Sequence, residues 1–139
     1  MDKKRKYRLQ NQQPAESAAF GLVSDEPGYR ISWLLNQHLG IRLNRVEDWI
    51  LTIRNSSVDQ HFVVYEVPAD GETRIRLVQN RSEEGIWLTD YKQVNYLILL
   101  SCQSDPGRTE DLFVRIGQMP TGVRGLFRLE LSRLAHLPV

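Results

Sequence analysis

Hydrophobic residues along this chain follow two spacings, and these divide it into predicted strands and helices. Residues 18–23 form a short apolar run, and residues 73–78 alternate apolar and polar side chains, as strands do. Residues 29–39 repeat apolar side chains every three or four positions and stop at Gly40, a residue type that often ends helices. The predicted strands are 18–23, 61–67, 73–78, 94–100 and 123–131, and the predicted second helix begins at Glu110 and Asp111 and ends before Pro120.

The middle of the chain predicts a hairpin and a central strand. A proline, an aspartate and a glycine between residues 67 and 73 supply turn chemistry, which joins 61–67 and 73–78 into the hairpin. Residues 94–100 (VNYLILL) are apolar almost throughout, which is typical of a strand covered on both faces. Residues 41–53 fit both a helix and a strand, and their alternating apolar side chains favour a strand.

The order of these elements predicts an α+β fold. A strand and a helix are followed by several strands, a central strand, a second helix and a last strand. A mostly antiparallel sheet with two helices on one face accommodates this order most simply. The closing strand–helix–strand predicts a split βαβ element like those of ferredoxin-like and ACT-like sandwiches. We expect a single α+β domain at residues 18–139, preceded by a basic and partly flexible segment at residues 1–17.

The predicted helix at 29–39 has two distinct faces. Its core stripe consists of Ile31, Leu34, Leu35, His38 and Leu39. Tyr29, Trp33 and Asn36 recur at spacings of four and three and fall together on nearly the opposite side. Two aromatic side chains in register form a second adhesive face, which either residues 41–53 or a partner must cover. Tyr29, Trp33 and Asn36 are therefore the candidate interaction surface.

Charge is concentrated at the N-terminus. The 139 residues carry 18 basic and 17 acidic side chains, a net charge of +1. Residues 1–8 alone have a net charge of +4, which leaves residues 9–139 with 13 basic and 16 acidic side chains. A domain that binds nucleic acid usually carries a strongly basic face, so this distribution argues against nucleic acid as a partner.

Composition excludes several classes of protein. A hydrophobic content of 41% and a mean hydropathy of −0.40 are typical of a soluble globular domain. The longest apolar run, residues 96–100, is far shorter than the roughly 20 residues that span a bilayer. No apolar stretch typical of a secretory signal follows the basic start, and a single cysteine excludes an intramolecular disulfide framework. We expect a cytoplasmic protein with no membrane partner.

No residues have the spacing of a catalytic or cofactor site. Cys102 and the histidines at 38, 61 and 136 are scattered and show no metal-ligand pattern. Glycine-rich phosphate loops and dinucleotide fingerprints do not occur in the sequence. Adjacent acidic residues such as Glu83 and Glu84 are explained by helix starts and solvated loops. The sequence therefore predicts a protein that is not an enzyme and that holds no cofactor or metal.

Arginine is favoured over lysine, with 14 arginines against 4 lysines. Arg74 and Arg76 are predicted to point outward from one strand, and Arg124 and Arg128 from another, where Phe127, Leu129 and Leu131 are predicted to point inward. If those strands were neighbours, four guanidinium groups would form a candidate anion-binding face for carboxylate or phosphate. The alternative is that Glu72 and Glu130 absorb these charges in cross-strand ion pairs.

Two stretches resemble the small bacterial family named for its IPExxxVDY signature. Residues 29–36 (YRISWLLN), 39–43 (LGIRL) and Arg45 resemble the family's DYRLAWxLN helix and the segment after it, with Gly28 in place of the aspartate. Residues 88–96 (LTDYKQVNY) align with the signature, matching it at Val94 and Tyr96. The family has no assigned activity, so the resemblance implies a fold and no catalytic residue.

These observations predict a non-enzymatic protein-interaction domain. Small sandwiches of this kind commonly leave strand edges open, and dimers cover them, so a homodimer is the simplest expectation and another protein the next. The alternative is an ACT-like regulatory domain that binds a small ligand. Fold likeness alone does not decide between these functions.

Overall fold

The computed structural model describes residues 16–52, 59–68, 73–83, 85–102 and 107–130. Of the predicted basic segment at residues 1–17, only residues 16 and 17 are among those described. His136 also lies outside the described residues. Within the described chain no helix is long and apolar enough to cross a membrane. The elements are β1 (Glu16–Val23), α1 (Gly28–Leu39), β2 (Asn44–Arg45), β3 (Trp49–Thr52), β4 (Asp59–Phe62), β5 (Val64–Glu66), β6 (Thr73–Gln79), the 3₁₀ turn η2 (Thr89–Tyr91), β7 (Tyr96–Cys102), α2 (Gly107–Gly117) and β8 (Gly125–Leu129).

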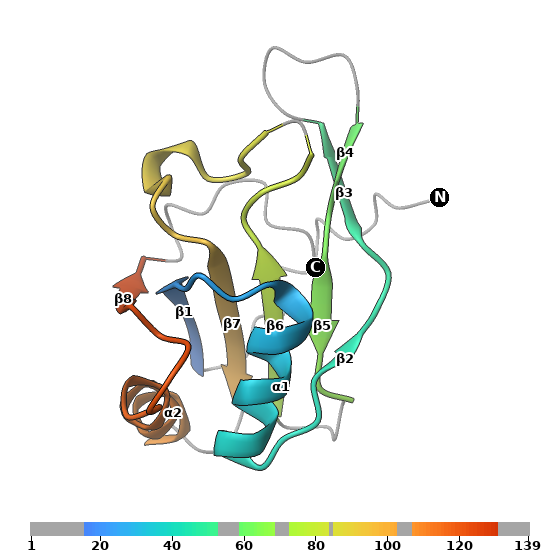
Figure 1. The fold of residues 1–139 in the computed structure, drawn as a ribbon. Helices are drawn as coiled ribbons and strands as arrows, with labels where there is room; N and C mark the ends of the chain where they lie inside the picture. The colour runs from blue at the N-terminus through green and yellow to red at the C-terminus, as the bar shows by residue number, and fades with distance from the viewer. Residues whose placement is uncertain (1–15, 53–58, 69–72, 84, 103–106, 131–139) are drawn as a thin grey trace.

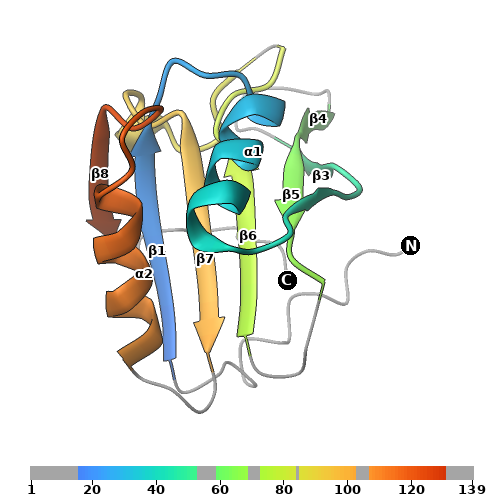
Figure 2. The same cartoon turned by 60° about the horizontal axis from the view of Figure 1, so that its bottom comes forward.

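Six of the strands form one antiparallel sheet in the order β2-β5-β6-β7-β1-β8, and β3 and β4 form a separate two-stranded sheet (Figure 1). Both helices pack on the same face of the large sheet (Figure 2). The predicted α+β class and antiparallel sheet are therefore confirmed. β5 pairs with β6, which confirms the predicted hairpin for residues 64–66, whereas residues 61 and 62 of the predicted strand belong to β4 and pair with β3. β7 pairs with both β6 and β1 as the predicted central strand.

The sheet has an apolar cluster on each face, which explains the unbroken apolar run of β7. Tyr96, Ile98 and Leu100 face the helices, whereas Leu97 and Leu99 face the other side. The helix-side cluster includes Phe20, Leu22, Ile31, Leu35, Ile75, Leu77, Leu112 and Ile116. The far-side cluster consists of Ala19, Phe62, Val64, Val78, Leu88, Leu97 and Leu99, with Trp49 and Trp87 packed against it. When both faces of a strand are covered, all of its side chains are buried, so the sequence is apolar throughout instead of alternating.

Local signals placed the first helix correctly. α1 ends at Gly40, whose φ of 69° lies in the left-handed region that a glycine adopts without steric cost. Within the ambiguous residues 41–53, Asn44–Arg45 and Trp49–Thr52 form the short strands β2 and β3, so the interpretation as strand is confirmed for these six residues. β2 belongs to the large sheet and β3 to the small one, and a short loop connects them.

Two predicted side-chain directions are wrong. Arg76 was expected to point outward from β6, but its side of the sheet is covered by Trp49 and the residue is 7% exposed. Phe127 was expected to point inward from β8, but it is 45% exposed. β8 is the end strand of the sheet, and its neighbours Leu126 and Arg128 are the residues that face the helices, where Arg128 stacks on Phe113 of α2. The alternating pattern of a strand shows which residues share a face of the sheet. It does not show which of the two faces is covered by other parts of the protein.

Candidate interaction surface

The outward side of α1 carries two exposed aromatic side chains. Tyr29 is 73% exposed and Trp33 is 51% exposed, and they lie one helical turn apart. The alternative in which residues 41–53 fold back to make Trp33 a core residue is therefore wrong. Ile31, Leu35 and Leu39 belong to the helix-side cluster instead, as the helical pattern predicted. The amphipathic sequence thus leaves this pair of rings on the solvent side of the helix.

An arginine lies over one of these rings. The guanidinium of Arg30 is 5.3 Å from the ring centre of Trp33, and its Nε atom is 3.8 Å from a carboxylate oxygen of Glu26. A cation over an indole face contributes about 0.5–1 kcal/mol at an exposed site. Arg30 therefore restricts the Trp33 ring from one side. We call Tyr29, Arg30 and Trp33 the aromatic face of α1.

Asn36, the third residue predicted for this surface, belongs to the fold instead. Its side chain accepts a hydrogen bond from the backbone N–H of Leu43 at 2.7 Å and donates one to the Leu43 carbonyl at 3.2 Å. This pair of bonds holds the segment after α1 against the helix. The amide is half-buried and is already engaged, so it is not an open hydrogen-bonding group for a partner.

Reciprocal hydrogen bonds fix α1 to α2. The Nε2 atom of His38 donates to the carbonyl of Arg115 at 2.7 Å, and Arg115 donates back to the carbonyl of His38 at 3.5 Å. His38, which the sequence placed on the core stripe of the helix, is thus a hydrogen-bonded packing residue. Because α1 is held at this end and packed on the sheet along its length, its aromatic face is presented on a rigid element.

The residues that resemble the IPExxxVDY signature hold the start of α1. The Asn95 side chain accepts a hydrogen bond from the backbone N–H of Ser24 at 2.8 Å, and the Tyr96 hydroxyl donates to the carbonyl of Glu26 at 2.6 Å. Val94 and Leu88, two more residues of this stretch, are buried. The contacts are structural ones: they join β7 to the turn that leads into the helix.

Burial raises the pKa of Tyr96 to about 12, with smaller contributions from Tyr65 and Glu26. Between the ordinary tyrosine pKa of about 10 and this value, the folded protein keeps the phenolic proton and the unfolded chain releases it, so stability falls as pH rises. We expect Tyr96→Phe to cost about 1 kcal/mol at neutral pH through the lost hydrogen bond. The advantage of the wild type should shrink from about pH 10 to about pH 12, as urea unfolding at several pH values would measure. A difference that stays constant over this range would contradict the buried phenol.

The four arginines of the candidate anion-binding face do not come together. β6, which carries Arg74 and Arg76, is separated from β8 by β7 and β1. Arg74 pairs with Glu66 across the hairpin at 2.9 Å, and Arg124 pairs with Asp25 at 2.8 Å. Arg128 pairs with Glu110 of α2. The predicted surface required β6 and β8 to be neighbours, and the strand order does not meet that condition.

Arg76 is enclosed between the large sheet and β3. Its guanidinium carbon lies 5.2 Å from the ring centre of Trp49, and its Nε atom has no hydrogen-bond partner among the described residues. Burial, together with the neighbouring charge of Arg74, lowers the pKa of Arg76 to about 10. The residue therefore contributes to the far-side packing and not to an open charged surface.

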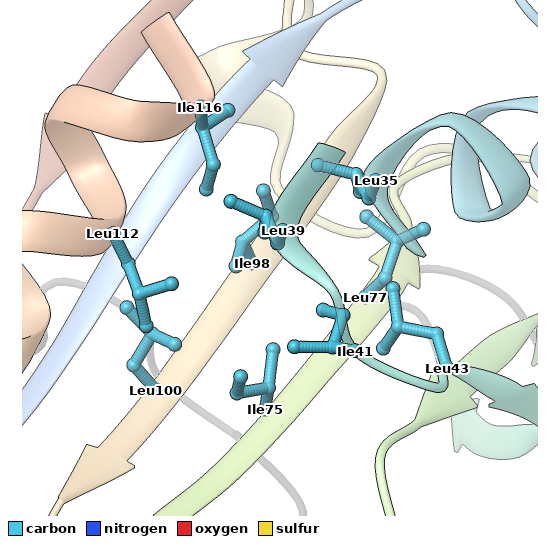
Figure 3. Close-up of a pocket in the computed structure, with 10 residues that line it drawn as sticks. All are labelled: Leu35, Leu39, Ile41, Leu43, Ile75, Leu77, Ile98, Leu100, Leu112 and Ile116. Carbon is cyan, nitrogen blue, oxygen red and sulfur yellow. The ribbon is translucent and has the colours of Figure 1, made fainter. Parts of the chain in front are cut away.

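The space between the two helices and the sheet is too small for a ligand. Figure 3 shows leucine and isoleucine side chains converging on it from α1, α2, β6 and β7, among them Leu35, Ile98 and Leu112. Its volume is about 10 Å³, at the lower limit for a single water molecule. Every side chain that lines it is apolar, so it is a packing gap within the helix-side cluster.

Two open polar clefts meet at the end of β6. One, of about 550 Å³, is lined by side chains that include Asp48, Asp59 and His61, and the other, of about 380 Å³, lies beside the turn before α1. They share Gln79 and Arg81. The described residues contain no cluster of three or more histidine, cysteine or acidic side chains able to hold a metal. These clefts have the size of a small-molecule site, but they lack the apolar lining that is usual for one.

Comparisons with protein-family models, curated proteins and solved structures found no match to this chain. The resemblance to the IPExxxVDY family therefore remains a prediction. The function has to be inferred from the surfaces described above.

The sequence pattern missed two exposed apolar residues. Ile50 of β3 is 56% exposed and Phe127 of β8 is 45% exposed. Both lie in alternating segments, and alternation assigns alternate residues to one face without indicating whether that face is covered. The position of β8 at the end of the sheet order is what leaves Phe127 open.

Proposed function

We propose that this protein is a non-enzymatic interaction domain that associates with a second copy of itself through the aromatic face of α1. The observation that carries the proposal is the joint exposure of Tyr29 and Trp33 on one side of a helix that packs on the sheet and is hydrogen-bonded to α2. Tyrosine, tryptophan and arginine are the residues enriched where protein interfaces gain most of their binding energy. A rigid helix that presents all three side by side loses little further entropy on association.

We also infer a ferredoxin-like arrangement and membership of the IPExxxVDY family. The strand order β8-β1-β7-β6 supports the ferredoxin-like arrangement. In it α2 connects β7 to β8, and these two strands lie on either side of β1. In this interpretation β2 to β5 are an insertion that widens the sheet. The hydrogen bonds of Asn95 and Tyr96 support membership of the IPExxxVDY family, because both signature-like residues hold the turn before α1. Neither inference adds a catalytic residue, and we propose a cytoplasmic location on the composition alone.

Trp33→Ala should weaken association of the full chain. Loss of a central tryptophan from an interface typically costs about 2 kcal/mol or more, which raises the dissociation constant about thirtyfold. Sedimentation velocity over a range of concentrations would show a lower average mass for the variant. The fold should remain intact, because Trp33 is half-exposed and contributes little to the core.

Val114→Ala is the matched control. Val114 is an exposed apolar residue on α2, 45% exposed, and it lies outside the aromatic face. We expect the control to associate like the wild type. A wild type that stays monomeric at high micromolar concentration, or a Trp33→Ala variant with unchanged mass, would contradict the proposal.

A regulatory domain that binds a small ligand is the second candidate. It is favoured by the two clefts that meet at Gln79 and Arg81, whose polar groups point to a charged or strongly polar ligand. A thermal-shift screen against a panel of charged metabolites distinguishes the two functions. A specific rise in melting temperature would support the ligand-binding function, since a ligand stabilises the folded state to which it binds.

A further inference from the structure

We propose that β8 forms a second self-association surface, at which two copies pair edge to edge and join their six-stranded sheets. This inference rests on the proposed self-association and adds to it a surface separate from the aromatic face. β8 ends the sheet and pairs only with β1 among the described strands. In Figure 2, β8 lies at one margin of the sheet and α1 covers the part toward the opposite margin.

The composition of β8 is unusual for an end strand. Proteins commonly protect such strands with lysine, proline or a bulge, because their unpaired backbone groups can bind another strand. β8 reads GLFRL, with neither lysine nor proline, and its exposed ring belongs to Phe127. Its one charged side chain, Arg128, is drawn toward α2 by Glu110 and stacks on Phe113 at 4.0 Å. No other described strand pairs with the outer edge of β8, and that edge presents an apolar strand.

Symmetry restricts how two copies of β8 can pair. A two-fold axis perpendicular to the sheet keeps each face on its own side, so directly opposed residues must belong to the same face. Opposed residues are then either both even-numbered or both odd-numbered, and the axis lies between the two strands, level with one residue that opposes its own copy. Only axes at Leu126, Phe127 and Arg128 leave most of this short strand paired.

Charge selects one of these three registers. An axis at Leu126 would oppose Arg124 to Arg128 of the second copy, and an axis at Arg128 would oppose that residue to itself. An axis at Phe127 opposes Arg124 to Glu130 of the second copy, and it does so twice, once at each end of the strand. Both side chains are exposed, and Arg124, which pairs with Asp25 through one nitrogen, keeps further N–H groups for a second carboxylate. Cross-strand pairs of opposite charge favour pairing, whereas like charges oppose it.

The same register brings the two Phe127 side chains together at the axis. Directly opposed side chains on paired strands have their Cβ atoms about 4.5–5.5 Å apart, which lets two rings stack. The most exposed apolar side chain of β8 would thus be covered by its own symmetry copy. A self-complementary strand of this kind points to a second copy of the chain as the occupant of the edge.

The test uses charge reversal in the full chain carrying Trp33→Ala, which weakens the aromatic face about thirtyfold and leaves β8 as the stronger surface. We expect this protein to form a dimer by sedimentation velocity. Adding Arg124→Glu, or Glu130→Arg, should raise its dissociation constant about tenfold, because each change places like charges at both ends of the paired strands. The double reversal should restore the affinity to within about threefold, because opposite charges face each other again. Arg42→Glu, the same charge change on an exposed residue outside β8, should have no effect.

Any other outcome contradicts one part of the two proposals: the aromatic face, the β8 surface or the Phe127 register. If the wild type associates but the Trp33→Ala protein is monomeric, the β8 surface is wrong and the aromatic face stands. If Trp33→Ala leaves the mass unchanged and the charge reversals dissociate the protein, self-association stands at β8 and not at α1. If the double reversal does not restore affinity, the Phe127 register is wrong. A monomeric wild type overturns both surfaces.

Discussion

Replacing Asn80 with alanine should lower the free energy of unfolding by about 3–5 kcal/mol, because the Leu88 N–H and the Val94 carbonyl lose their partner and the Tyr91 carbonyl keeps only its bond from the Val94 N–H. Asn80 is fully buried. Its side chain donates to the carbonyls of Tyr91 and Val94, at 3.2 and 3.0 Å, and accepts from the N–H of Leu88 at 2.9 Å. These three bonds hold together the segment that leads from β6 to β7.

Asn44→Ala is the matched control for this prediction. Asn44 is exposed, and its side chain makes one long bond, 3.4 Å, to the carbonyl of Arg42. We expect a loss within about 0.5 kcal/mol for the control, as for most surface substitutions. Urea unfolding of the two variants measures the difference. A loss below about 1 kcal/mol for Asn80→Ala would show that water replaces the amide at these groups.

Phe20→Ala should cost about 3–5 kcal/mol, the usual loss when a large ring is removed from a core. Phe20 of β1 is 1% exposed and meets Phe113 of α2 edge to face, with ring centres 4.9 Å apart. Its removal leaves a cavity between α2 and the sheet, which the backbone of a central strand cannot close. Thermal and urea unfolding would both shift strongly, whatever the protein concentration.

The same substitution at Phe127 should leave the stability of the monomer nearly unchanged and weaken its association. Phe127 is 45% exposed on the end strand, so Phe127→Ala should change the stability of the monomer by less than about 1 kcal/mol. The association proposed for β8 should weaken, because the ring at the symmetry axis is lost. A large loss of monomer stability for Phe127→Ala would show that the ring packs within its own chain, and it would count against the β8 surface.

The candidate surface was partly visible in the sequence. Spacing alone placed Tyr29 and Trp33 together on the side of α1 away from the core, and both are exposed. The same spacing included Asn36, which bonds to Leu43 instead. A wheel of one helix contains no information on the chain that follows it, so it could not show that residues after Gly40 return to this amide. The role of Asn80 was equally hidden, since a single polar residue in a loop has no periodic signal.

Local patterns in the sequence predicted most of the elements and the α+β class. The apolar run of β7, the helical spacing and terminal glycine of α1 and the turn chemistry before β6 are local, and local sterics and burial act on them directly. Which surfaces are covered depends instead on how the elements pack together. β3 closes over Arg76, and β7 and β1 separate the strands that carry the four arginines. Phe127 stays open because β8 is the last strand. Side-chain direction repeats every two residues, whereas coverage depends on segments that are distant along the chain and meet only in the fold.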